Sequence, residues 1–205
     1  MARVIAGEAG GRRLAVPAGR DTRPTSDRAR EGLFATISSI AGPLDGARVL
    51  DLYAGSGAVG LEALSRGAGH VLLVEQGGRA VRVIKENISS IGLPGAVLVT
   101  DRVERVLARG PDGDRYDVVF ADPPYALADA AVERVLVLLA GTGWLAPGAL
   151  VVVERATRSG PVSWPDGFVP DRERRYGEAT FWYALAAGIP ESPLPPPVPA
   201  SPAGE

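Results

Sequence analysis

Residues 48–60 constrain the fold of this chain more than any other stretch. They run Arg-Val-Leu-Asp-Leu-Tyr-Ala-Gly-Ser-Gly-Ala-Val-Gly. The apolar residues at the start predict a buried strand, the glycines predict a tight turn, and residues 58–67 predict a helix. A strand, a glycine turn and a helix in this order present backbone N–H groups and a helix N-terminus to a ligand. The stretch therefore predicts an α/β sheet that binds something small and polar.

The nature of that ligand depends on Asp51. The spacing Gly55-x-Gly57-x-x-Gly60 fits a dinucleotide fingerprint, but this pattern is weak in a chain with 26 glycines. Asp51 would repel a pyrophosphate, and it suits a ligand with a cationic centre or an amine, such as S-adenosylmethionine. The alternative is that Asp51 only caps the turn. The motif alone leaves both interpretations open.

From residue 46 onward, apolar strand patterns alternate with helical ones, which is typical of a parallel α/β sheet. We expect strands at 48–52, 70–75, 96–100, 116–121 and 149–154, with His70 opening the second, and helices at 58–67, 77–91, 102–109 and 128–140. Residues 171–176 and 180–186 predict a terminal hairpin joined at Gly177-Glu178. The expected fold is a Rossmann-like, seven-stranded, mostly parallel sheet with one antiparallel strand.

A small extension precedes this sheet. Residues 3–17 predict a β-hairpin that turns at Gly10-Gly11, and a helix should begin at Ser26 or Asp27 and run to about residue 40. We therefore expect an N-terminal hairpin and helix over 1–44 and a main domain over 45–187. Residues 188–205 contain seven prolines and predict a disordered tail.

Composition excludes several classes of site. The chain has no cysteine and one histidine, so thiolate metal sites and cysteine nucleophiles are excluded and no metal site is expected. No apolar run is long enough for a membrane span, and we expect a cytoplasmic protein. The net charge is −2, yet residues 1–30 carry seven arginines against three acidic residues. This arm is compatible with phosphate contact, and a solvated surface is the alternative.

The most specific motif is Asp122-Pro123-Pro124-Tyr125, which follows the apolar strand expected at 116–121. With this composition the tetrapeptide is expected about 0.002 times by chance. The prolines fix the turn and remove N–H donors, which leaves carbonyl groups to accept hydrogen bonds. A carboxylate and a carbonyl together can hold both hydrogens of an exocyclic amine, and Tyr125 offers a flat face on which a base can stack.

Such a site would activate an amine by orienting it. The lone pair of an exocyclic amine is delocalised into the purine ring, and two acceptors on its hydrogens would aim that lone pair at the methyl group of a sulfonium donor. The proton then leaves either to Asp122 or to water, and the residues do not decide between these routes.

With these motifs the chain resembles a class I S-adenosylmethionine-dependent methyltransferase. Within that class it closely resembles the RsmD family, which methylates the N2 amine of a guanine in 16S rRNA of the small ribosomal subunit. The resemblance covers about residues 3–186 and includes Gly11-Arg12-Arg13-Leu14, residues 23–31, residues 51–57 and the Asp122 motif. Tyr53 replaces the more usual phenylalanine, which keeps an aromatic ring.

The resemblance implies a role for each matching position. The methionine part of S-adenosylmethionine would lie on the residues around the glycine turn, namely Asp51, Tyr53, Ala54, Gly55, Ser56 and Gly57. Glu75 would accept from the ribose hydroxyls, and Asp101 would reach the adenine amine. Asp122, Pro123, Pro124 and Tyr125 would be catalytic, with Asp122 also at the cofactor. The candidates for rRNA phosphate contact are Arg12, Arg13, Arg23, Arg28 and Arg30.

Three rival functions remain to be compared with this one. A DNA adenine or cytosine amino-methyltransferase would use the same motif, but the chain lacks room for a target-recognition domain. A dinucleotide-dependent oxidoreductase conflicts with Asp51 and with the terminal hairpin. A non-catalytic RNA-binding module would not need Asp122. The expected protein is therefore a monomeric enzyme that acts on 16S rRNA or on the 30S subunit during its assembly.

Overall fold

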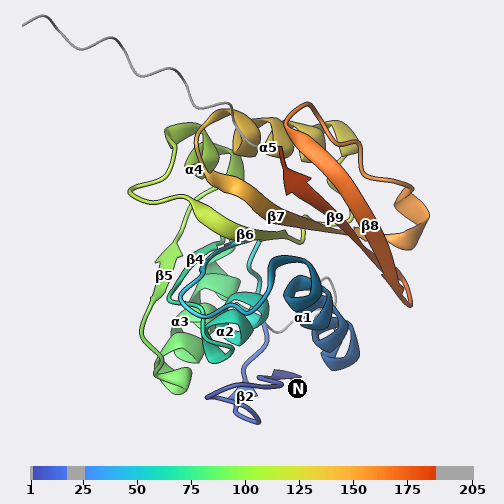
Figure 1. Cartoon of the computed structure of the whole chain (residues 1–205). Helices are drawn as coiled ribbons and strands as arrows, with labels where there is room; N and C mark the ends of the chain where they lie inside the picture. The colour runs from blue at the N-terminus through green and yellow to red at the C-terminus, as the bar shows by residue number, and fades with distance from the viewer. Residues whose placement is uncertain (1, 18–25, 188–205) are drawn as a thin grey trace, which may run out of the picture.

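A seven-stranded sheet forms the centre of the molecule (Figure 1). The structure is a computed structural model, and it describes residues 2–17 and 26–187. The strand order is β5-β4-β3-β6-β7-β9-β8. The strands are β3 (Arg48–Leu52), β4 (His70–Val74), β5 (Ala96–Val99), β6 (Tyr116–Ala121), β7 (Leu145–Ala156), β8 (Phe168–Tyr176) and β9 (Ala179–Ala186).

The first five of these strands run parallel to one another, and β9 lies antiparallel between β7 and β8. This confirms the predicted mostly parallel sheet with one antiparallel strand. Because the strands from β3 to β7 are parallel, their carboxyl ends lie at one edge of the sheet. That edge is where open α/β sheets bind ligands.

Helices cover both faces of the sheet (Figure 1). On one face, α1 (Asp27–Ala41), α2 (Ala58–Ser65) and α3 (Gly78–Ile91) contribute to one apolar cluster. On the other, α4 (Val103–Arg109) and α5 (Asp129–Gly141) contribute to a second. The central strands are apolar on both faces for this reason. No helix in the described part of the chain is long and apolar enough to cross a bilayer.

Two strands are longer than the sequence predicts. Strand β7 begins at Leu145 instead of residue 149, although Pro147-Gly148 is typical of a turn, because a register shift opposite Tyr116 and Val118 accommodates it. Strand β8 begins at Phe168 instead of residue 171. It contains Pro170, which an edge strand tolerates because one side of its backbone faces solvent.

The N-terminal hairpin pairs β1 (Ala2–Arg3) with β2 (Arg13–Leu14) in antiparallel register, as predicted. Helix α1 begins after Ser26, whose hydroxyl accepts from the N–H of Ala29 at 3.2 Å. The apolar side chains of both elements join the same cluster as the sheet. The predicted tail over 188–205 lies outside the described residues.

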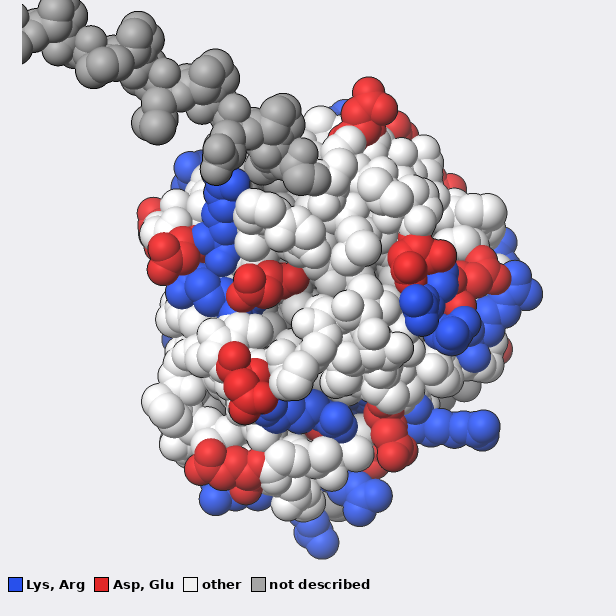
Figure 2. Space-filling view, viewed as in Figure 1, with Lys and Arg blue, Asp and Glu red and all other residues white. Residues whose placement is uncertain are grey.

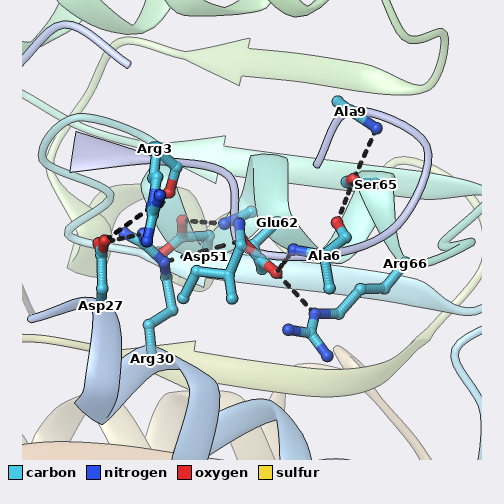
Figure 3. A network of polar contacts seen from close by, with 11 residues as sticks. Arg3, Ala6, Ala9, Asp27, Arg30, Asp51, Glu62, Ser65 and Arg66 are labelled. Atoms are coloured by element: carbon cyan, nitrogen blue, oxygen red, sulfur yellow. Dashed lines mark hydrogen bonds and ion pairs between the residues drawn. The ribbon is translucent and has the colours of Figure 1, made fainter. Parts of the chain in front are cut away.

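Polar contacts from α2 hold this hairpin in place (Figure 3). The buried Glu62 carboxylate accepts from the N–H groups of Ile5 at 2.6 Å and Ala6 at 3.1 Å. The hydroxyl of Ser65 accepts from the N–H of Ala9 at 2.9 Å. The hairpin is thus attached to the helix that follows the glycine turn.

Candidate active site

A cavity of about 560 Å³ lies at the carboxyl edge of the parallel strands. Its volume is in the range usual for sites of small molecules and cofactors. It brings together residues from the ends of four strands, from the glycine turn and from the Asp-Pro-Pro-Tyr turn. The predicted site residues on its wall are Asp51, Tyr53, Ala54, Gly55, Ser56, Glu75, Asp101, Asp122, Pro123, Pro124 and Tyr125.

Asp51 lies behind the glycine turn and is 2% exposed. Its Oδ2 accepts from the N–H of Gly60 at 2.9 Å, so the carboxylate fixes the first turn of α2 while it borders the cavity. Burial, partly opposed by the hydrogen bond from the Gly60 N–H and assisted by the charge of Glu75, raises the pKa of this carboxyl to about 7. A cation in the cavity would favour its charged form.

The glycines of the turn are required by space and by backbone conformation. Gly57 is the N-cap of α2 with φ 76°, a left-handed conformation in which a side chain is strained. A Cβ on Gly60 would lie 2.8 Å from Val71 Cγ1 and 2.9 Å from Leu73 Cδ2. Gly57 and Gly60 are therefore structural within the turn, and neither is among the residues that line the cavity.

Glu75 follows β4 and accepts a hydrogen bond from the glycine turn that follows the neighbouring strand β3. Its Oε2 accepts from the N–H of Gly55 at 3.0 Å, and its Oε1 accepts from the N–H of Gly77 at 2.7 Å. Each carboxylate oxygen has two lone-pair sites, so both can still accept from a ligand hydroxyl. The carboxylate is thus held in a fixed position on the cavity wall.

Asp101 follows β5 and is also held by several donors. It accepts from the N–H of Arg102 at 2.8 Å and forms ion pairs with Arg105 and Arg109. The hydrogen bond from the Arg102 N–H, and then the two cations, lower the pKa of this carboxyl. Asp101 is therefore a charged acceptor on the wall of the cavity.

The Asp-Pro-Pro-Tyr turn begins where β6 ends. The N–H of Asp122 donates to the carbonyl of Leu52 at 3.3 Å, and the N–H of Leu127 donates to the carbonyl of Pro124 at 2.8 Å. Tyr125 is 41% exposed at the rim of the cavity. Burial raises the pKa of the Asp122 carboxyl well above its usual range, the charges of Glu154 and Asp51 raise it further, and Arg155 lowers it.

Glu154 and Arg155 are the next pair at this edge, and the sequence did not single them out. Ala121 pairs with Val153, so Asp122 and Glu154 occupy equivalent positions on neighbouring strands. Both charged residues of β7 are buried. Arg155 donates to the carbonyl of Leu127 at 3.0 Å and to the carboxylate of Asp129 at 2.7 Å, and it thereby anchors the loop after the Asp-Pro-Pro-Tyr turn.

Other residues of the cavity wall were also not predicted. They come from the N-terminal hairpin, from the start of α3 and from the start of α4, and they include Val16, Pro17, Arg79, Arg102 and Glu104. Tyr53, which was predicted, is the one non-glycine residue with positive φ in the described segments, at 60°. Its buried hydroxyl has no hydrogen-bond partner within those segments. Strain of this kind gathers at functional sites.

The candidate RNA contacts differ from one another in exposure. Arg13 and Arg28 are exposed, and the Nη1 of the exposed Arg12 donates to the carbonyl of Ile91. The prediction for Arg30 is wrong, because its side chain is 0% exposed. Arg23 lies outside the described residues.

Arg30 instead joins the hairpin to two helices (Figure 3). Its guanidinium forms ion pairs with Asp27 at 3.0 Å and with Glu62 at 3.8 Å, and it donates to the carbonyl of Arg3. A phosphate cannot reach it.

The surface drawn in Figure 2 intersperses basic and acidic side chains, with basic ones projecting at the lower edge, where Figure 1 places the hairpin. Nowhere in the described segments do three or more potential metal ligands form a group.

Comparison with protein families gives one match over nearly all of the described chain. The model of the family described as Conserved hypothetical protein 95 matches residues 2–185. The chain is 35% identical to ribosomal RNA small subunit methyltransferase D of Escherichia coli (strain K12) over 179 residues, which are 87% of each chain. It is 41% identical to the putative rRNA methyltransferase YlbH of Bacillus subtilis (strain 168) over 126 residues, 60% of this chain and 66% of that protein.

Solved structures show the same architecture. The putative methyltransferase yhhF from Escherichia coli superposes with a TM-score of 0.78 at 32% identity, over 90% of this chain and 97% of that one. A hypothetical protein from Thermus thermophilus superposes with a TM-score of 0.75 at 35% identity, over 92% of this chain and 100% of that one. The architecture of the chain is thus one that these proteins share.

Proposed function

The chain belongs to the family of ribosomal RNA small subunit methyltransferase D, and on that premise we propose that it transfers a methyl group from S-adenosylmethionine to the exocyclic N2 amine of a guanine in 16S rRNA. One observation carries the proposal. A single cavity has the glycine turn with Asp51 on one side and the Asp122-Pro123-Pro124-Tyr125 turn at its rim. A methyl donor and an amine acceptor can therefore meet in it.

The residues of the cavity fit S-adenosylmethionine, which supplies a methyl group on a cationic sulfur. Glu75 holds fixed oxygens that suit two ribose hydroxyls, and Asp101 suits an amine on the adenine ring. The backbone of residues 53–56 lies along the cavity where the methionine part would bind. The buried carboxyls of Asp51 and Asp122 favour a cation nearby, because opposite charges attract strongly where water is excluded.

The Asp122 turn would orient the amine. The Pro124 carbonyl accepts from the N–H of Leu127, and we assign the two amine hydrogens to the Pro123 carbonyl and the Asp122 carboxylate. Tyr125 at the rim would stack on the base, a contact worth about 1–3 kcal/mol per base. Orientation supplies much of the rate, because the lone pair then faces the methyl group before reaction.

The same turn can take the proton that methylation releases. A carboxyl whose pKa is raised accepts a proton at neutral pH more readily than an ordinary aspartate does, and burial raises the pKa of Asp122. We assign the proton to Asp122 and keep release to water as the alternative. The two routes predict different pH profiles for an asparagine variant.

We further propose that the exposed Arg12, Arg13 and Arg28 contact rRNA phosphates beside the cavity. The hairpin and α1 would then act as an RNA-contact extension of a methyltransferase domain that spans residues 45–187. An enzyme that modifies a ribosomal subunit during assembly would work in the cytoplasm, and we propose that it does so as a monomer.

The deciding experiment is transfer of a labelled methyl group. The substrates are 30S particles from a strain that lacks this activity, naked 16S rRNA from the same strain, and DNA as the test of the rival function. We expect transfer to the N2 of one guanine in rRNA and none to DNA. Absence of transfer to every rRNA substrate, or transfer to DNA alone, would contradict the proposal. Asp112→Ala, in the exposed loop before β6, is the matched control for Asp122 variants.

A further inference from the structure

Asn87 is a polar residue in the buried stripe of α3. The stripe is otherwise apolar, with Val81, Ile84 and Ile91, yet Asn87 is 2% exposed. A buried carboxamide is costly unless its donors and acceptor are bonded. Its partners therefore show what this position does.

The carboxamide joins two separate segments of the chain. Its Oδ1 accepts from the N–H of Ala15 at 2.8 Å, and its Nδ2 donates to the carbonyl of Ala15 at 3.0 Å. The same nitrogen donates to the carbonyl of Ser56, in the glycine turn, at 2.9 Å. Both N–H donors are used, so this one side chain fixes the end of the hairpin relative to the turn.

The segment that Asn87 holds is part of the cavity wall. Val16 and Pro17, which follow Ala15 directly, line the cavity together with Ser56. The rest of the hairpin is attached elsewhere, through Glu62 and Ser65 on α2 (Figure 3). Asn87 is thus the described contact that ties the hairpin to the glycine turn itself.

We propose that Asn87 is a positioning residue that makes the N-terminal hairpin a wall of the cofactor cavity. The inference rests on the proposed function, since the ligand of the cavity is taken to be S-adenosylmethionine. Because one carboxamide holds both segments, a ligand on the glycine turn stabilises the position of residues 15–17. By linkage, RNA that fixes the hairpin raises the affinity for the cofactor by the same factor that the cofactor raises the affinity for RNA.

The first test removes the carboxamide. Asn87→Leu keeps the size and deletes all three hydrogen bonds. We expect the Kd for S-adenosylhomocysteine, measured by calorimetry, to rise about tenfold, as for the loss of a buried polar contact that shapes a site. The KM for S-adenosylmethionine should rise while kcat at saturation changes little.

A matched variant separates this effect from general loosening of the hairpin. Ser65→Ala removes the hydrogen bonds to the N–H of Ala9 and to the carbonyl of Ala6, and it leaves Asn87 and the turn intact. We expect this variant to lower the melting temperature and to bind S-adenosylhomocysteine as the wild type does. Equal Kd values for wild type, Asn87→Leu and Ser65→Ala would overturn the proposal, and so would equal losses of affinity in the two variants.

The second test needs no variant and therefore does not depend on whether Asn87→Leu folds. Hydrogen exchange of the Ala15 N–H in the wild type should slow severalfold when S-adenosylhomocysteine is added, because that N–H donates to Asn87. Unchanged exchange at saturating ligand would overturn the inference. Failure of the proposed function is recognised separately, since the wild type would then neither bind S-adenosylhomocysteine nor methylate rRNA.

Discussion

The carboxylate of Glu75 accepts a hydrogen bond from the N–H of Gly55 at 3.0 Å, so the end of β4 holds the glycine turn that follows β3. The other oxygen of Glu75 holds the N–H of Gly77 before α3. One side chain thus fixes two turns of the cavity. A residue expected only to bind a ribose therefore also shapes the turn beside it.

Glu75→Ala should weaken cofactor binding by more than the loss of its two contacts to the cofactor would account for. It removes the acceptor of both turns, and we expect the Kd for S-adenosylhomocysteine to rise by at least about tenfold. Glu75→Gln keeps one oxygen and should lose less. Calorimetric titration measures both, with Glu86→Gln on the exposed face of α3 as the control. An unchanged Kd for Glu75→Ala would contradict the assignment of Glu75.

Asp122→Ala should lower kcat by about 10²–10⁴-fold, while the affinity for S-adenosylhomocysteine, whose sulfur carries no charge, stays close to that of the wild type. Asp122→Asn keeps an acceptor oxygen for the amine and loses the carboxylate. If Asp122 takes the proton, the wild-type rate falls below the raised pKa of this carboxyl, and that acid limb disappears in Asp122→Asn. Single-turnover rates against pH measure this. Persistence of the limb in the variant would assign the proton to water, and equal loss of binding and turnover in Asp122→Ala would mean that Asp122 is misassigned.

Asp51→Asn should stabilise the protein at alkaline pH. The pKa of Asp51 is raised from 3.8 to about 7 in the folded protein, so between these values the folded state keeps a proton that the unfolded chain has released. The retained proton stabilises the folded state at low pH. This stabilisation is lost as pH rises through about 7, and the loss is at most ~4 kcal/mol. The melting temperature of Asp51→Asn relative to wild type should therefore increase from pH 5 to pH 8.

The exposed control for that comparison is Asp114→Asn, whose difference from wild type should not vary with pH. Asp51→Asn should at the same time bind the cationic cofactor more weakly, because a carboxylate is lost from the cavity wall. A pH-independent difference in melting temperature for Asp51→Asn would show that this carboxyl is charged in the folded protein at pH 5.

Arg30→Met should unfold the protein more easily without a specific effect on RNA. It leaves the buried Glu62 without one of its cations, and breaking a buried ion pair costs about 3–5 kcal/mol. Arg28→Ala on the same helix should leave the melting temperature unchanged and weaken rRNA binding, with a smaller salt dependence. Denaturant unfolding and filter binding separate the two. A stable Arg30→Met with weakened RNA binding would restore the phosphate role.

Gly60→Ala should destabilise the glycine turn although alanine favours helices. The added Cβ would lie within 3.1 Å of Val71, Leu73 and the Asp51 carboxylate, and overpacking of this kind costs about 1–3 kcal/mol. Gly78→Ala at the start of α3 is the control, because nothing lies within 4 Å of its added Cβ. The difference between the two variants in free energy of unfolding measures the effect, and equal values would contradict it.

The sheet and the main site residues were predictable because simple geometry governs them. Alternating apolar strands and helices specify a parallel sheet, and parallel strands end at one edge. Asp51, Glu75, Asp101 and Asp122 all lie at or just after strand ends, so they meet in one cavity. Glu154 follows the same rule on β7, and that position is the signal that could have identified it.

Residues whose role depends on distant packing were not predictable. Arg30 on α1 has the sequence context of a solvated helix start, and it is buried because the hairpin and Glu62 on α2 close over it. Asn87 occupies an apolar position of α3, and its partners are 72 and 31 residues away along the chain. A polar residue in an otherwise apolar stripe is the only local sign of such a contact.

The position of β9 between β7 and β8 has a consequence for synthesis of the protein on the ribosome. Among the described strands, β8 pairs only with β9, and β7 keeps an open edge until β9 is inserted. The sheet cannot close in the order in which the chain is made, because the last described strand fills an interior position. A nascent chain that ends before Ala179 therefore presents an unpaired β7 edge, which invites aggregation.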